Sequence, residues 1–178
     1  WEEGVVSARL THTEVEDYID VIPLVGGFEA LGNIGTGTRT EFEVQATLPT
    51  DRAGIPGGRL IARAALRETD IEDPLTGESR RFSGDDGFGC GVTFTQDLDG
   101  GRWAWGMNHS CDVDAGTSYR VRELRFNEAE PPFNAFVQWK PSDDLSVRVD
   151  FSNLTDAEQR RRRDIYAGPR DSAPLSLR

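Results

Sequence analysis

Few residues of this chain have side chains that could carry out chemistry. Histidine and cysteine occur twice each, as His12, His109, Cys90 and Cys111. Their spacing contains neither a CxxC nor an HxxxH pair, so no zinc site is expected. No serine lies in a nucleophile-elbow sequence, and two scattered histidines do not support a Ser-His-Asp triad. The sequence therefore predicts a protein that is not an enzyme, with no catalytic residue, no metal and no cofactor.

Clustered carboxylates are the remaining candidate for chemistry. Asp70, Glu72 and Asp73 are followed by Asp85 and Asp86 in one predicted loop. Because Ca²⁺ prefers carboxylate oxygens as ligands, a calcium site is one interpretation of this segment. Acidic side chains are mostly exposed to water in folded proteins, and solvated loop charge is the interpretation that we adopt.

The segment Asp99-Gly100-Gly101-Arg102 predicts a β-hairpin. A two-residue Gly-Gly loop suits a primed turn, with Asp99 and Arg102 as the hydrogen-bonded closing pair. Carried outward, this register places Cys90 directly opposite Cys111 at a non-hydrogen-bonded site, where Cα atoms lie about 4.5 Å apart. That separation allows a disulfide, which we predict for protein made in an oxidising compartment. The alternative is two free thiols that lie opposite each other by chance.

Apolar and polar residues alternate along the chain with the period of two that is typical of half-buried strands. In the clearest segment, 38–48, Phe42 and Val44 share one side while Glu41 and Glu43 share the other. The same alternation occurs in three further segments, 6–11, 60–67 and 145–152. We therefore predict an all-β fold, an antiparallel meander of about eight strands that forms a barrel or barrel-like sheet. A single β-barrel-type domain would cover residues 1–178.

The connections between the predicted strands alternate in length. The short ones are 49–58, 100–101 and 141–144, and the long, polar ones are roughly 16–37, 70–88 and 113–132. Short turns at one end and long loops at the other are the pattern of an outer-membrane barrel. The alternative is a soluble β-sandwich or small barrel with one face in its core, which produces the same alternation of side chains.

Two details belong to this interpretation. Four aromatic residues, expected near strand ends beside the short turns, would suit the aromatic girdle of a membrane barrel: Trp103, Trp105, Trp139 and Phe151. Residues Ser118 to Phe126 are predicted as one strand with a β-bulge, because Tyr119 and Leu124 are out of phase. We place this strand in an extracellular excursion.

Composition excludes two classes of protein. The chain has 178 residues, with 20 basic and 31 acidic side chains, for a net charge of −11. Nucleic acid is therefore not expected as a partner. Hydrophobic residues make up 37% of the chain, and no run approaches the roughly 18 apolar residues of a membrane helix. A helical membrane protein is excluded.

Several short motifs, weak alone, become more specific through their order and spacing. They are Gly32-Asn33-Ile34-Gly35, Asp73-Pro74-Leu75-Thr76-Gly77, Trp103-Ala104-Trp105-Gly106, and the stretch from Trp139-Lys140-Pro141 through Asn153-Leu154-Thr155-Asp156 to Arg163, Tyr166 and Gly168-Pro169-Arg170. Over essentially the whole chain, this series resembles the C-terminal barrel strands of TonB-dependent outer-membrane receptors.

The resemblance implies a fragment of a larger barrel, without the plug domain and without the usual final strand. It further implies import of a scarce nutrient, such as a ferric siderophore, across the bacterial outer membrane. The implied partners are the parent plug domain, an inner-membrane energy-transducing complex, outer-membrane lipid and a small-molecule ligand. On this hypothesis seven charged residues face the lumen of the parent barrel: Arg39, Glu41, Glu43, Arg63, Arg67, Arg148 and Asp150.

The alternative function is a soluble β-barrel or β-sandwich module that binds a small ligand. The two hypotheses require opposite orientations of one face, which six residues report: Phe42, Val44, Leu60, Phe94, Trp105 and Val147. A sheet excised from a barrel also exposes two edges and an apolar face. We therefore expect the isolated chain to close on itself, to associate with copies of itself or to aggregate.

Overall fold

The computed structural model describes residues 4–111 and 114–170. Strands make up 65% of the structure and helix 4%, so the all-β prediction is confirmed. The strands are β1 (Val5–Val15), β2 (Ile19–Pro23), β3 (Glu29–Asn33), β4 (Gly37–Pro49), β5 (Gly58–Glu72), β6 (Ser79–Arg80), β7 (Phe88–Leu98), β8 (Trp103–Ser110), β9 (Asp114–Tyr119), β10 (Glu123–Ala129), β11 (Phe133–Ser142), β12 (Leu145–Phe151) and β13 (Gln159–Ile165). Two 3₁₀ turns, η1 (Asp51–Ala53) and η2 (Asp99–Gly101), lie between strands.

One large antiparallel sheet forms the body of the molecule. Its strands follow the order β1-β4-β5-β7-β8-β11-β12, with the short β6 paired to the end of β5. In the described part of the chain β1 and β12 each have one neighbour, so this sheet is open rather than closed on itself. Association of the chain through these two edges stays a prediction for the protein in solution.

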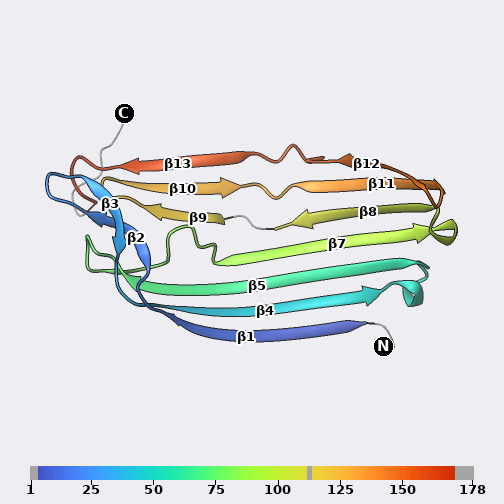
Figure 1. Cartoon of the computed structure of the whole chain (residues 1–178), viewed down its shortest axis with the longest axis horizontal. Coiled ribbons are helices and arrows are strands. Elements are labelled where there is room, and N and C mark those ends of the chain that lie inside the picture. Colours follow the sequence, from blue (N-terminus) through green and yellow to red (C-terminus); the bar gives the residue numbers. More distant parts are fainter. Residues whose placement is uncertain (1–3, 112–113, 171–178) are drawn as a thin grey trace.

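The two ends of the sheet differ as the connection lengths predict. Turns β4–β5, β7–β8 and β11–β12 lie together at one end, on the right in Figure 1. The long connections lie at the other end and carry strands of their own, the β2–β3 hairpin and the three-stranded sheet β13-β10-β9. We call this end the loop end. It is the part of the structure in which chain segments distant in sequence meet.

The predicted excursion between β8 and β11 is present but is built differently. Leu124 of β10 lies opposite Tyr119 of β9, and the Arg120 amide donates a hydrogen bond to the Glu123 carbonyl at 3.0 Å. Residues 118–126 are therefore two strands joined by a tight turn, and the single bulged strand predicted for them is wrong. The change of phase in the sequence marks a reversal of the chain.

The register of the β7–β8 hairpin agrees with the prediction. Leu98 lies opposite Trp103, and Gly91 lies opposite Ser110. Gly100 and Gly101 have φ values of 63° and 89°, the left-handed conformation that a type I′ turn requires of both central residues. The Gly-Gly pair therefore sets this register through backbone freedom that other residues lack.

The hydrogen-bonding phase of the hairpin is the reverse of the predicted one. The Asp97 amide points to the other neighbour and donates to the Gly57 carbonyl at 3.0 Å, while the Cys111 amide donates to the Cys90 carbonyl at 3.0 Å. The cysteines thus form a hydrogen-bonded pair. Asp99 also has a positive φ of 50°, so the irregular loop includes Asp99 as well as the two glycines. Side-chain faces are unaffected, because they depend on alternation alone.

The registers of all seven main strands sort apolar from polar side chains. The even-numbered residues of β1, β4, β5 and β7 share one face with the odd-numbered residues of β8, β11 and β12. We call this the apolar face and the opposite one the polar face. Leu10, Phe42 and Val149 of the apolar face are 71%, 43% and 50% exposed, whereas Phe94 is 9% exposed. Most of the apolar face is thus in contact with solvent.

The buried residues gather mainly at the loop end. Ile71, Phe82 and Val121 are buried there, and the ring of Tyr18 stacks on Phe82 at 4.3 Å. Ile71 belongs to the polar face of β5. At the loop end this face is covered by other chain segments and is not exposed to solvent. The closest packing therefore lies inside the loop end, over the end of β5.

Candidate functional site

All seven charged residues expected to face a lumen lie on the polar face. Arg39, Glu41, Glu43, Arg63 and Arg67 lie on the adjacent strands β4 and β5. Two more, Arg148 and Asp150, occupy the same face at the far edge of the sheet, on β12. The sequence therefore predicts which residues share a face, and the structure divides them into two separate groups.

The β4–β5 group forms a chain of alternating charge. Glu41 lies directly opposite Arg67. Its carboxylate accepts a hydrogen bond from Arg39 at 3.0 Å and forms an ion pair with Arg67, whose Nε lies 3.3 Å from Glu41 Oε1. Arg67 in turn pairs with Asp86, from the loop before β7, at 2.5 Å. Because these four groups are half-buried, the loop acid Asp86 anchors its segment to the polar face rather than lying free in water.

The β12 group rests on an aromatic ring. Arg148 and Asp150 form an ion pair at 2.8 Å, and the Arg148 guanidinium lies 3.7 Å from the centroid of the Phe136 ring. Phe136 lies across Gly106, its partner on β8. The Phe136 ring thus lies over Gly106, whose missing side chain leaves room for it. The Arg148 guanidinium lies over the ring, and Asp150 pairs with the guanidinium.

Substitution of Gly106 tests this stack. A Cβ at Gly106 would lie 2.7 Å from the Phe94 carbonyl oxygen and 2.5 Å from the Phe136 ring. We expect Gly106→Ala to lower the free energy of unfolding by about 1–3 kcal/mol, because backbone as well as ring must move. Gly91→Ala is the matched control on the same face, where the nearest atom is Arg63 Nε at 3.3 Å. Denaturant unfolding should separate the two variants, and equal losses would contradict the prediction.

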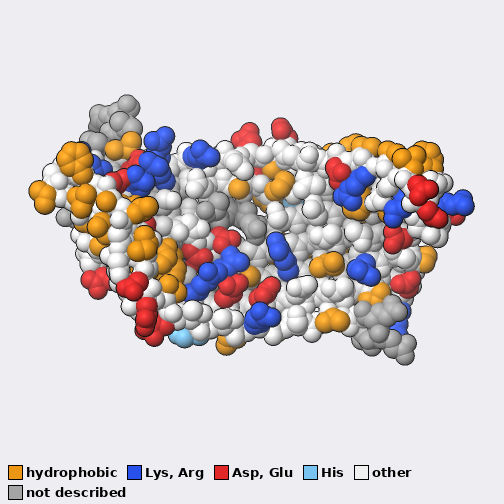
Figure 2. Space-filling view, viewed as in Figure 1, with side chains coloured by type: hydrophobic (Ala, Val, Ile, Leu, Met, Phe, Trp, Pro, Cys, Tyr) orange, Lys and Arg blue, Asp and Glu red, His pale blue; other side chains and the backbone are white. Residues whose placement is uncertain are grey.

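Shallow hollows lie along the polar face, between side chains of the described residues. Their volumes are about 430, 350, 420 and 100 Å³. Arg39 lines one, Glu41 and Arg63 each line two, and Arg148 and Asp150 line another. Figure 2 shows Lys or Arg and Asp or Glu side chains intermingled over β4 and β5. This face can hold polar small molecules by hydrogen bonds and by charges of either sign.

A second cluster of charges, at the loop end, is buried. Asp73 is 1% exposed, and its Oδ2 accepts from Arg80 Nε at 2.7 Å and from Arg170 Nη2 at 2.6 Å. Arg80 also donates to Asp20 at 2.9 Å, and Asp20 accepts from Ser83 at 2.6 Å. Segments separated by up to 97 residues therefore converge on one carboxylate.

Electrostatics hold this cluster in its charged form. Burial alone would raise the pKa of the Asp73 carboxyl, but hydrogen bonds from Arg170 and the Leu75 amide, with the charge of Arg80, lower it below its ordinary value. Asp73 Oδ1 accepts from the Leu75 and Thr76 amides at 2.8 and 3.2 Å. Each lone pair of the carboxylate is thus matched by a donor, which is what a buried charge requires.

The interpretation of Asp73 as solvated loop charge is therefore wrong. Alternation along β5 gives no signal of this burial, since Thr69, Ile71 and Asp73 continue the odd-numbered polar face and yet all three are buried. Asp85 and Asp86 also have partners in the protein. Asp85 accepts a hydrogen bond from the Thr69 hydroxyl, and Asp86 forms an ion pair with Arg67. Among the described residues no group of acids, histidines or cysteines could hold a metal ion.

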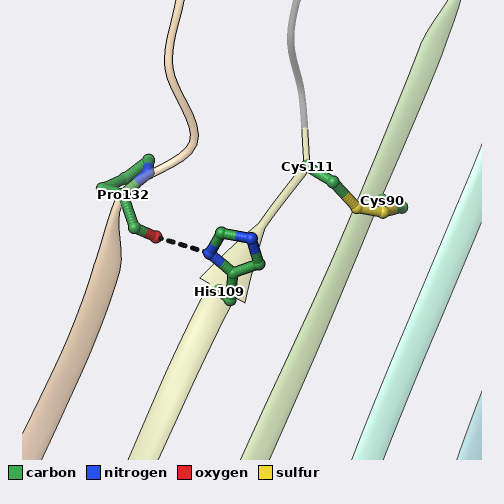
Figure 3. Close-up of a disulfide and its surroundings, with 4 residues drawn as sticks. All are labelled: Cys90, His109, Cys111 and Pro132. Carbon is green, nitrogen blue, oxygen red and sulfur yellow. Dashed lines mark hydrogen bonds between the residues drawn. A yellow bond between two sulfur atoms is a disulfide. The ribbon is translucent and has the colours of Figure 1, made fainter. Parts of the chain in front are cut away.

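The disulfide predicted from the hairpin register is present. Cys90 and Cys111 are linked, with their Cα atoms 5.0 Å apart. Figure 3 shows the link between β7 and the end of β8, beside His109, whose ring nitrogen lies 3.3 Å from the Pro132 carbonyl. The bridge thus fixes β8 to β7 at the point where the chain leaves the main sheet.

Comparison of the chain with protein-family models, curated proteins and solved structures finds no match. No helix in the described part of the chain is long and apolar enough to cross a membrane. The resemblance to TonB-dependent receptors accordingly rests on the motifs of the sequence.

Proposed function

We propose that this chain is part of the transmembrane barrel wall of a TonB-dependent receptor in the bacterial outer membrane. The observation that carries the proposal is the apolar face, which runs across seven strands and is exposed along most of them. A large contiguous apolar surface on a sheet whose other face is polar is suited to lipid contact. The receptor family itself is proposed on the motif resemblance.

Strand dimensions support this proposal. A strand crossing a bilayer needs about 9–11 residues when tilted. β1, β4, β5, β7 and β11 have 11, 13, 15, 11 and 10 residues. On the apolar face Trp103 lies opposite Trp139 near the short turns, with stacked rings 5.7 Å apart, as expected of an interfacial girdle. Phe151 is not beside the short turns, because it lies opposite Ala135 toward the loop end.

The polar face would then line the lumen. Its charged residues of both signs, and the hollows between them, would contact a polar nutrient such as a ferric siderophore on its way through the parent barrel. The plug domain and the inner-membrane energy-transducing complex are partners of the proposed parent receptor.

A soluble small-ligand module would place the apolar face in a core. Of the six reporter residues, Phe42 and Val147 are 43% and 44% exposed, and Phe94 is buried. The other three are intermediate. In the described residues no second sheet is paired or packed over this face, since the smaller sheets lie at the loop end. These exposures favour the membrane wall over the soluble module.

Two arginine substitutions one residue apart test the proposal. Val44 lies on the apolar face of β4, and Gln45 on its polar face. A charge on the lipid side of a barrel strand costs about 2–4 kcal/mol near the bilayer midplane, so Val44→Arg should weaken partition into phosphatidylcholine vesicles by about 30-fold or more. Gln45→Arg should partition like the unmodified chain. Flotation of the vesicles measures both.

Two results would count against a membrane wall. Equal partition of the two variants would show that the apolar face does not contact lipid. Failure of the unmodified chain to bind vesicles, with unfolding of Val44→Arg in water, would favour the soluble module, because a core does not tolerate an unpaired charge.

A further inference from the structure

The small sheet β13-β10-β9 has an inner face that can be identified from its contacts. Tyr119 of β9 lies under Arg80, whose Cζ is 4.3 Å from the ring centroid, and so faces the buried cluster. Leu124 lies opposite Tyr119, and Phe126 lies opposite Arg162 of β13. These side chains share the inner face, since residues directly opposite in a sheet point the same way.

The outer face of the same sheet carries a row of arginines. Arg125 of β10 lies directly opposite Arg163 of β13, and Arg161 lies opposite Asn127. Like charges placed directly opposite each other destabilise a sheet. The outer row thus concentrates positive charge in a chain whose net charge is −11.

The two rows differ in how their charge is neutralised. On the inner face Arg162 pairs with Asp164 at 3.4 Å, and Arg160 lies 3.4–3.5 Å from two glutamates. On the outer face Arg125 and Arg163 share one acid, Glu123. Within the described residues no carboxylate is paired with Arg161. The outer row is therefore the one with positive charge left for a ligand.

The outer row continues the apolar face of the main sheet. β10 and β13 lie beyond β11 and β12 at the loop end (Figure 1). The apolar face of β11 and β12 consists of their odd-numbered residues, and the outer face of β10 and β13 also consists of their odd-numbered residues. Tyr119, on the inner face, lies against Arg80 and Arg170 of the cluster around Asp73, which continues the polar face of β5. An apolar surface therefore ends in a row of exposed guanidinium groups.

We infer that Arg125, Arg161 and Arg163 bind the phosphate groups of anionic lipid headgroups at the edge of the apolar face. The inference rests on the proposed membrane function, and it names the lipid chemistry recognised there. Guanidinium groups donate paired hydrogen bonds to phosphate. A row at the boundary between apolar surface and water lies at headgroup depth, where anionic lipids attract basic side chains.

Vesicle flotation of the full chain tests the inference. Binding to phosphatidylcholine vesicles is compared with binding to vesicles in which part of the lipid is phosphatidylglycerol. Each arginine at an anionic surface strengthens binding about fivefold. Arg161→Gln with Arg163→Gln should therefore lose about 25-fold in affinity for the anionic vesicles, while binding to the phosphatidylcholine vesicles is unchanged. The matched control, Arg160→Gln with Arg162→Gln, removes the same charge from the inner row of the same strand and should lose little.

The outcomes separate this inference from the proposed function. Equal losses in the two double variants would overturn it, since net charge alone would then explain binding. Failure to bind either kind of vesicle would instead contradict the membrane wall. Binding of the unmodified chain to anionic vesicles should weaken with added salt, and salt-independent binding would overturn the inference without any variant. Displacement by millimolar inorganic phosphate would identify a site for free phosphate and overturn the lipid assignment.

Discussion

Asp73→Asn is expected to destabilise the loop end by about 3–5 kcal/mol, the usual cost of removing one partner from a buried ion pair. Asp73 Oδ2 accepts from both Arg80 and Arg170, while Oδ1 accepts from two backbone amides. An asparagine that keeps the backbone bonds would turn its NH₂ group toward two guanidinium donors. Arg170 would then lose its paired carboxylate, and Arg80 would keep only Asp20.

Hydrogen exchange measures where this loss occurs. Amides of β9 and β10 should lose protection in Asp73→Asn, because Tyr119 and Arg170 connect these strands to the cluster. Glu72→Gln is the matched control, because this exposed acid is the last residue of β5 and directly precedes Asp73. Equal loss of protection in the two variants would show that the buried cluster does not hold the loop end together.

Acid should act on the same cluster. Because the folded-state pKa of Asp73 lies below its ordinary value of 3.8, its contribution to stability is complete above that value. It is lost as the pH falls through the lower, folded-state pKa. The loop end of the unmodified protein should thus open in strong acid, whereas Asp73→Asn should lack this part of the pH dependence.

Reduction of the Cys90–Cys111 disulfide is expected to lower the free energy of unfolding by about 3 kcal/mol in the chain-entropy model. The two cysteines are 21 residues apart in sequence, and the bridge closes the β7–β8 hairpin far from its turn. Without the bridge, the end of β8 is held to β7 by backbone hydrogen bonds such as that from Cys111 to Cys90. Denaturant unfolding of oxidised and reduced protein gives the difference.

A double variant provides the control for the disulfide. Cys90→Ala with Cys111→Ala should match the reduced protein in stability and should not respond to reductant. Non-reduced peptides of protein made in an oxidising compartment should contain the linked pair. Unlinked cysteines in such protein, or equal stability of the oxidised and reduced forms, would contradict the prediction.

Local sequence patterns predicted much of the main sheet. Alternation assigns each side chain to a face without knowledge of the partner strand, and the Gly100-Gly101 turn sets the β7–β8 register through its backbone conformation. These two signals together place Cys90 opposite Cys111. The hydrogen-bonding phase was predicted wrongly, because Asp99 adds a residue of positive φ to the loop. That conformation depends on more than the Gly-Gly pair.

The sequence by itself determined most strands of the main sheet, their two faces and the grouping of Arg39, Glu41 and Arg67 on the polar one, since each depends on neighbours within a few residues. Only the tertiary structure decided that Asp73 is buried, because its partners Arg80 and Arg170, and the Asp20 carboxylate that also pairs with Arg80, come from three separate segments. The same holds for the outer arginine row. Arg125 and Arg163 are brought opposite each other by a pairing across 38 residues of sequence, and no local pattern encodes a contact between segments that far apart.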